Sequence, residues 1–309
     1  MVRRRAPYHA EVTWRHMVMT IGRLLVALGI LILLFVAYLL WGTGISESGH
    51  QSALRQQFNQ ALAQEKGATA GSSTSTTVPS SLVRQLAGGS EPTEGQPVAV
   101  LQIPKISLEK VVVQGTATDD LHLGPGHYAH TPLPGQPGNV GIAGHRTTYG
   151  APFYNLNELA PGDKIELTTL QGTFTYVVVR SMVTSPSDNA VLDSSTGPEL
   201  TLTTCNPRFS ASQRLVVQAD LTGTPAHAPT GAASTASVAH SAQGLGGAQG
   251  NWYWAALWGL AALDFAVTLW LFAHGKRLQW LLYGAGAVPL LVMLFFFFQN
   301  VSPLLPASY

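Results

Sequence analysis

Cys205 is the only cysteine among the 309 residues of the chain. A lone thiol cannot form an intramolecular disulfide, and its neighbours lack the spacing of a metal site. It ends a β-type run directly before a loop, where rigid scaffolds often carry reactive groups. A free cysteine can instead be a small buried hydrophobe, but alternation along the run places this one on a polar face. That face carries Thr201, Thr203 and Cys205. The pattern favours a cysteine nucleophile for acyl transfer.

A cysteine nucleophile needs a proton acceptor and a group that stabilises the tetrahedral oxyanion. His145 ends the apolar run "GNVGIAGH" much as Cys205 ends its own run, so we expect both side chains at one rim of the fold. Arg214 begins the run after the cysteine loop and is expected beside Cys205 if the two runs pair. Arg208, inside that loop, is the main competitor for the oxyanion role. The other arginines of this region are less well placed: Arg146 and Arg180.

Three further histidines lie in the Pro/Gly-rich segment "LHLGPGHYAHTPLPG": His122, His127 and His130. Their spacing raises the question of zinc, but no cysteine or Glu/His pair accompanies them. We therefore expect no metal site and no cofactor. Asp188 and Asn189 are polar loop residues for which capping of the loop is the expected role.

The elements that would position these residues are short runs rich in Val, Ile, Leu and Thr, broken by Gly, Pro and Asp. One pair, "KIELTTLQGTFTYVVV", predicts a hairpin centred on Gln171-Gly172. Seven or eight such runs between residues 97 and 222 predict a mainly β fold closed into a barrel. Such a domain is large enough to fold without disulfides.

Three apolar runs flank the predicted barrel. Leu24 to Trp41, Trp252 to Ala273 and Trp280 to Phe298 are each about the length that spans a bilayer, which takes roughly 20 residues. No convincing cleavage site follows the first run, so it predicts an uncleaved anchor rather than a signal peptide. Arginines before the first run and the basic loop between the other two predict that both segments are cytoplasmic. The barrel is then extracellular, on a multi-pass cell-membrane protein.

The resulting domain map has nine parts. It consists of a cytoplasmic tail (1–23), a membrane helix (24–42), an extracellular linker (43–96), the barrel (97–222), a second extracellular linker (223–251), a membrane helix (252–273), a cytoplasmic loop (274–279), a membrane helix (280–298) and a short extracellular tail (299–309). Both linkers are rich in small polar residues and are expected to be flexible tethers. The first also carries weak helical periodicity through Leu54, Phe58 and Leu62.

The chain resembles the sortases, the cysteine transpeptidases of bacterial cell surfaces. The resemblance rests on "LTLTTC" followed by "RLVVQA", and on the upstream "GIAGHR". "GHYAHTPLPGQPGN" and "AGHRTTYGAPF" look most like the class E group of actinobacteria. The resemblance implies an eight-stranded β-barrel with short helices, and it assigns catalytic roles to His145, Cys205 and Arg214, the residues that spacing also selects.

The resemblance also implies a reaction and its partners. The substrate would be a secreted protein with a C-terminal signal of the Leu-Pro-x-Thr-Gly or Leu-Ala-x-Thr-Gly type, cleaved between Thr and Gly through a thioester. The acceptor would be an amine of a lipid-linked peptidoglycan precursor. Four residues are candidates for substrate binding, although the tyrosines could equally be core residues: Thr203, Thr204, Tyr128 and Tyr149.

Other functions remain open from the sequence. A pilin-polymerising sortase is one alternative, although its Asp-Pro-aromatic lid motif is absent before the barrel. An L,D-transpeptidase would carry its cysteine in a Ser-His-Gly-Cys-type setting, which this chain lacks. A non-enzymatic, membrane-tethered domain that binds wall components is the third. Nucleic acid is not an expected partner, because 17 basic residues are balanced by 16 acidic ones with no basic stripe.

Overall fold

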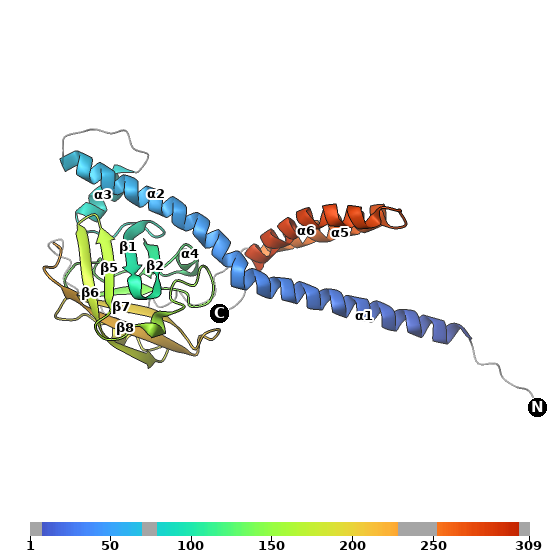
Figure 1. The fold of residues 1–309 in the computed structure, drawn as a ribbon, viewed down its shortest axis with the longest axis horizontal. Coiled ribbons are helices and arrows are strands. Elements are labelled where there is room, and N and C mark those ends of the chain that lie inside the picture. The colour runs from blue at the N-terminus through green and yellow to red at the C-terminus, as the bar shows by residue number, and fades with distance from the viewer. Residues whose placement is uncertain (1–7, 70–78, 228–251, 303–309) are drawn as a thin grey trace, which may run out of the picture.

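Eight short strands close into one barrel in the computed structural model, which describes residues 8–69, 79–227 and 252–302 (Figure 1). The strands follow one another around the barrel in the order β1-β2-β3-β4-β7-β8-β6-β5. Their bounds are β1 Pro97–Ile103, β2 Leu108–Gln114, β3 Gly126–His127, β4 Asn139–Ala143, β5 Lys164–Thr169, β6 Gly172–Thr184, β7 Glu199–Asn206 and β8 Gln213–Thr222. The predicted closed, mainly β fold is confirmed.

Most neighbouring strands are antiparallel, and two pairs are parallel: β2 with β3, and β4 with β7. The hairpin β5–β6 pairs Thr169 with Gly172, so its turn is Leu170-Gln171, one residue earlier than expected. Gly172 has a φ of 142°, a conformation that costs glycine less than other residues. Short helical turns connect the strands: η2 Pro104–Ile106, α4 Thr118–Leu121, η3 Leu156–Glu158 and η4 Ala190–Leu192.

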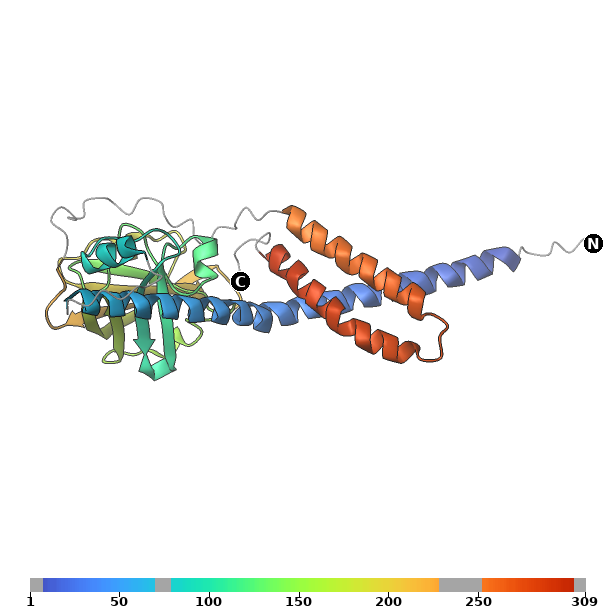
Figure 2. The same ribbon diagram turned by 90° about the horizontal axis from the view of Figure 1, so that it is seen from above.

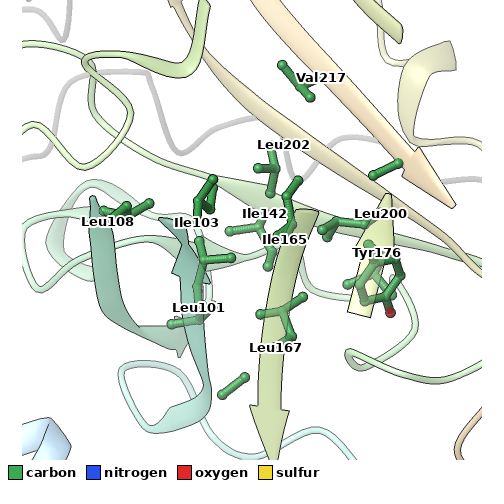
Figure 3. Close-up of a cluster of buried hydrophobic side chains, with 14 of the residues drawn as sticks. Leu101, Ile103, Leu108, Ile142, Ile165, Leu167, Tyr176, Leu200, Leu202 and Val217 are labelled. Atoms are coloured by element: carbon green, nitrogen blue, oxygen red, sulfur yellow. The ribbon is translucent and has the colours of Figure 1, made fainter. Parts of the chain in front are cut away.

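The barrel interior is filled by aliphatic side chains from alternate strand positions (Figure 3). On β7 the inward residues are Leu200 and Leu202, both fully buried, and Ile142 of β4 lies beside them. This packing leaves the other face of β7 to Thr201, Thr203 and Cys205, as the period-two alternation requires. The hydrophobic core therefore fixes which face of β7 carries the thiol.

The N-terminal region is one long helical rod. α1 (Tyr8–Ala37) continues through a π-helical turn, η1 (Tyr38–Gly42), directly into α2 (Thr43–Thr69). The rod runs away from the barrel along α1 and lies against it along α2 (Figures 1 and 2). This differs from the flexible linker expected over residues 43–96. The helical periodicity of that segment corresponds to α2, and the apolar side chains of this helix pack against another part of the fold.

That part of the fold is the outer face of the barrel. Leu54 and Phe58 of α2 are buried against Val111 of β2, and the short helix α3 (Ser80–Ala87) adds Leu82 and Leu86 to the same cluster. A buried Phe or Leu in such a cluster contributes about 1.5–3 kcal/mol by removal from water. Helices α2 and α3 are thus part of the folded domain.

Three helices are long and apolar enough to cross a membrane: the N-terminal rod, α5 (Trp252–Ala273) and α6 (Gln279–Val301). α5 and α6 form a hairpin that extends from the same end of the barrel as α1 in both views (Figures 1 and 2). Parts of the predicted cytoplasmic tail, of both linkers and of the final tail lie outside the described residues: 1–7, 70–78, 228–251 and 303–309.

Candidate active site

Cys205 and Arg214 face each other across a strand pair. β7 and β8 are antiparallel, and their register places Cys205 directly opposite Arg214. Opposite residues in such a pair have their Cβ atoms about 4.5–5.5 Å apart and on the same face. The Arg214 guanidinium donates to the carbonyls of Ala211 and Gln213, both at 3.1 Å, which holds it at the mouth of the cysteine loop. The structure thus brings these two candidates together.

His145 comes from the strand on the other side of β7. β4 runs parallel to β7 with Ala143 beside Thr203, and the Gly144 N–H donates to the Thr203 carbonyl at 3.1 Å. Continuing both strands by two residues leads to His145 and Cys205. Neighbouring strands lie about 4.8 Å apart. The parallel pairing of β4 and β7 is therefore what aligns the two residues along the rim.

A pocket opens on the polar face of β7, and Cys205 and His145 lie outside its lining. Arg214, Thr203 and Tyr128 line it, and the segment from β6 to η4 forms another wall with Asp188 and Asn189. The Tyr128 hydroxyl and the Thr203 hydroxyl are hydrogen-bonded at 3.0 Å. Two of the four candidate substrate-binding residues therefore lie in the pocket wall.

The other two candidates lie elsewhere. Thr204 faces the opposite side of β7, and its hydroxyl donates to the Gly144 carbonyl at 2.7 Å. This contact ties the cysteine strand to the residue before His145. Tyr149 lies behind His145, with the two ring centroids 5.1 Å apart. Both residues hold the surroundings of the histidine rather than the pocket wall.

The Cys205 thiol is buried, with 3% of the residue exposed. Burial raises the pKa of the thiol, because the anionic form is poorly solvated there. The charges of Arg214 and Arg146 act in the opposite direction and lower this pKa. Burial is the larger effect, so the thiol is mainly protonated at neutral pH. The thiolate is the nucleophilic form.

His145 is also buried, and neither of its ring nitrogens has a hydrogen-bond partner among the described residues. Burial, together with the charge of the neighbouring His122, lowers the pKa of His145 to about 3. The imidazole is therefore neutral at physiological pH and can accept a proton. In the structure the thiol and the imidazole are therefore both neutral, and they are not hydrogen-bonded to each other.

The remaining arginines near the thiol make structural contacts. Arg146 is 5% exposed and donates to the Cys205 carbonyl at 3.1 Å and to Asn206 Oδ1 at 2.6 Å. Arg208 lies over the ring of Tyr154, with its guanidinium carbon 4.0 Å from the ring centroid. It also donates to the Tyr154 carbonyl at 3.2 Å. Both residues fasten the cysteine loop to the segment around η3.

The histidines of the Pro/Gly-rich segment have separate environments. His127 is fully buried, within 2.9 Å of both Gln114 Oε1 and the Pro132 carbonyl. His122 stacks on the Tyr149 ring with centroids 3.8 Å apart. The segments that the structure describes contain no group of three or more His, Cys, Asp or Glu residues that could hold a metal ion.

Sequence reasoning missed the contacts of His122 and Arg146. The sequence offers His122 only as a possible zinc ligand, and its stacking on Tyr149 depends on two loops that meet in space. The sequence ranks Arg146 as less well placed than Arg214, and no local pattern indicates that it reaches the Cys205 carbonyl. The sequence does place Arg146 directly after His145, and this indicates that it lies near the same strand end as the histidine.

Comparisons with known proteins agree with these features. Residues 101–222 match the family model described as Sortase domain. Sortase SrtE1 of Streptomyces coelicolor is 35% identical over 213 residues, which cover 64% of this chain and 55% of that protein. Sortase D of Bacillus subtilis is 37% identical over 118 residues, 38% of this chain and 58% of that protein. The chain therefore spans little more than half the length of these two curated relatives.

Solved sortase structures are also among the proteins similar to this chain. The structure of sortase E from Streptomyces avermitilis is 42% identical in sequence, covers 43% of this chain and 91% of its own, and has a TM-score of 0.40. Sortase E1 from Streptomyces coelicolor, solved with a tripeptide in the active site, is 36% identical with coverage of 43% and 91% and a TM-score of 0.41.

Proposed function

Because this chain belongs to the sortase family of cysteine transpeptidases and is similar to class E sortases, we propose that it transfers secreted proteins to the cell wall. The substrate would carry a C-terminal sorting signal of the Leu-Pro-x-Thr-Gly or Leu-Ala-x-Thr-Gly type. The acceptor would be an amine of a lipid-linked peptidoglycan precursor. The observation that supports this most is the register of Cys205 opposite Arg214, at a pocket beside the strand that leads to His145.

The first half of the proposed reaction begins from the neutral pair. The sulfur of Cys205 attacks the Thr carbonyl carbon of the Thr-Gly bond, and His145 accepts the thiol proton. The carbonyl oxygen becomes an oxyanion, which the Arg214 guanidinium stabilises. The carbon–nitrogen bond then breaks, and His145 returns the proton to the glycine amine as it leaves. The product is a thioester between Cys205 and the threonine.

The second half reverses these roles. An acceptor amine attacks the thioester carbonyl and gives its proton to His145, which now acts as a base. The oxyanion forms again beside Arg214, and the carbon–sulfur bond breaks. Cys205 recovers its proton, and the threonine is left in an amide bond with the acceptor. The atoms balance without any cofactor.

The test is direct observation of the thioester. The full-length protein in detergent is mixed with sorting-signal pentapeptides, and mass spectrometry follows both peptide cleavage and an acyl adduct on Cys205. We expect the adduct with the wild-type chain, its release by an added amine, and neither event with Cys205→Ala. Full cleavage by Cys205→Ala would refute the proposal. A wild-type chain that binds wall fragments without forming an adduct would support the non-enzymatic alternative.

We further propose that the protein is a multi-pass membrane protein with the barrel outside the cell. Three apolar helices and the basic residues around them support this arrangement. In a Cys205→Ala background, single cysteines replace Ser237, Gln279 and Ser308. An impermeant thiol reagent applied to whole cells should label the first and last positions and leave the middle one unlabelled. Labelling at Gln279 would contradict the three-span topology.

A further inference from the structure

Tyr149 is held at three points that come from three separate parts of the chain. Its backbone N–H donates to the Thr43 hydroxyl at 3.0 Å, and its phenol oxygen is 2.9 Å from the Ser302 hydroxyl. Its ring stacks on His122 with centroids 3.8 Å apart. Thr43 is the first residue of α2, and Ser302 directly follows α6. The loop after His145 is therefore attached to the helices that flank the barrel.

The backbone of this loop needs such support. Tyr149 has a φ of 49° and Ala151 a φ of 43°, both in the left-handed region that disfavours residues with a side chain. Each such residue costs on the order of 1–3 kcal/mol and persists only where its surroundings hold it in place. The hydrogen bond from Tyr149 to Thr43 supplies that restraint at the strained residue itself.

The orientation of the His145 ring depends on Tyr149. Both ring nitrogens lack a hydrogen-bond partner in the described part of the chain, so no polar contact fixes the imidazole. Its aromatic neighbours are Tyr149, at 5.1 Å between centroids, and His122, at 6.1 Å. A ring without hydrogen bonds takes its orientation from the side chains that pack against it. A shift of Tyr149 would therefore turn or release the imidazole.

Thr43 is itself well fixed. Its hydroxyl donates to the Leu39 carbonyl at 2.9 Å, across the π-helical turn that joins the membrane-type helix to α2. One turn further on, the buried Glu47 carboxylate forms an ion pair with Lys110 of β2 at 2.6 Å and lies against Gly150. The start of α2 is thus clamped to the barrel on both sides of the His145 loop.

We propose that Thr43 and Tyr149 are positioning residues for His145, so that the junction between the first membrane-type helix and the barrel orients the catalytic imidazole. Ser302 adds a second anchor from the last helix. This inference rests on the proposed acyl transfer, in which His145 must meet both the thiol and the departing amine. A misplacement of about 1 Å in such a group can cost about a hundredfold in rate.

The experiment uses the full-length protein in detergent and compares three variants. Thr43→Val keeps the shape of the side chain but removes the hydroxyl, whereas Thr43→Ser keeps the hydroxyl. Ser48→Ala is the matched control, because the Ser48 hydroxyl lies on the same helix, is exposed and donates only to the Ile45 carbonyl. For each we measure kcat and KM for peptide cleavage, the thermal midpoint, and the NMR signals of the His145 ring.

We expect Thr43→Val to lower kcat by about tenfold, which corresponds to the loss of one buried hydrogen bond, with little change in KM. The His145 ring signals should shift in this variant, and both effects should be absent from Thr43→Ser and Ser48→Ala. Unchanged kcat and ring signals in Thr43→Val would overturn the proposal, as would an equal loss in Thr43→Ser. If the wild-type chain cleaves no peptide, acyl transfer fails, and the ring signals still test the positioning.

Discussion

At the scale of single residues, two arginines are available for the oxyanion, and their surroundings differ. Arg214 lines the pocket directly opposite Cys205, whereas Arg208 lies over the Tyr154 ring on the exposed side of the loop. Both side chains are positively charged, so a general electrostatic effect on the oxyanion would give similar losses of activity when either arginine is replaced. A directed hydrogen bond to the oxyanion would make the two arginines differ, because Arg214 lines the pocket and Arg208 does not.

We therefore expect Arg214→Ala to lower kcat/KM by about a hundred- to a thousandfold, the usual cost of losing one oxyanion donor. Arg214→Lys should recover little, because lysine keeps the charge but not the planar set of donors. Arg208→Ala is the comparison and should lower kcat/KM by about tenfold at most, since it removes hydrogen bonds that hold the loop but no proposed donor to the oxyanion. A crippled Arg208→Ala beside an active Arg214→Ala would reverse the assignment.

At the scale of elements, the contact between α2 and the barrel depends on one buried amide. Gln51 accepts from the Val111 N–H at 2.7 Å and donates to the Val111 carbonyl at 3.0 Å and the Leu123 carbonyl at 2.8 Å. These groups of β2 and the loop before β3 would otherwise be buried without partners. The amide therefore supplies the backbone hydrogen bonds that a neighbouring strand would otherwise make with β2.

Replacing this amide should loosen the whole contact. We expect Gln51→Leu to lower the free energy of unfolding by about 1–3 kcal/mol, the cost of leaving a buried polar group without a partner. Gln56→Leu, at an exposed position of the same helix, is the matched control and should change it by less than about 0.5 kcal/mol. Thermal unfolding of the full-length protein in detergent measures both, and equal stability of the two variants would contradict the role given to Gln51.

Local patterns predicted most of the strands and parts of the helical rod, but not its continuity. The strands were readable because Val, Ile and Thr alternate between Gly and Pro breaks, and this alternation also placed Cys205 on the polar face. The continuity of the rod was not readable, since Gly42, Gly44 and Gly49 each weaken a helix by about 1 kcal/mol. Packing against the barrel overcomes that cost, and packing is invisible in a single segment.

The alignment of His145 with Cys205 has a similar limit. Spacing indicated that both end an apolar strand, but the parallel pairing of β4 and β7 joins residues about sixty positions apart, and no local signal specifies such a pair. The loop from Arg146 to Ala151 was equally hidden. Its conformation depends on Thr43 and Ser302, which lie near opposite ends of the chain.

At the scale of the whole molecule, buried histidines make stability depend on pH. Burial lowers the pKa of His127 to about 4 and that of His145 to about 3, from an ordinary value of about 6.5. The unfolded chain therefore binds more protons than the folded one between about pH 6.5 and pH 3. The stabilisation that these neutral rings contribute is complete above about pH 6.5 and is lost as the pH falls through the folded pKa values.

Buried carboxyl groups act in the opposite direction. Burial raises the pKa values of Glu47, Glu91 and Asp120, so their folded forms bind protons more readily than their unfolded forms. These groups offset part of the histidine effect as the pH falls. Both the wild type and a single histidine variant contain these carboxyl groups. The difference between their free energies of unfolding therefore reports the histidine alone.

We expect His127→Gln to flatten the dependence of the free energy of unfolding on pH below about 6.5, by up to about 1.4 kcal/mol per pH unit. The variant should be less stable than the wild type at pH 7, where it loses the hydrogen-bonded ring, and the gap should narrow as the pH falls. His227→Gln, at an exposed position, is the matched control. A constant gap between His127→Gln and wild type from pH 7 to pH 4.5 would contradict this account.

The continuous helix from α1 through η1 to α2 would determine the distance between the bilayer and the active site. Trp41 ends the first apolar run, and two residues later the Thr43 hydroxyl already contacts the loop that follows His145. In the proposed topology the distance between the active site and the bilayer would then be constant. A substrate still inserted by its own hydrophobic tail would need a spacer of matching length between that tail and its sorting signal. The helical rod would thus make the enzyme select substrates by the length of this spacer as well as by the residues of the signal.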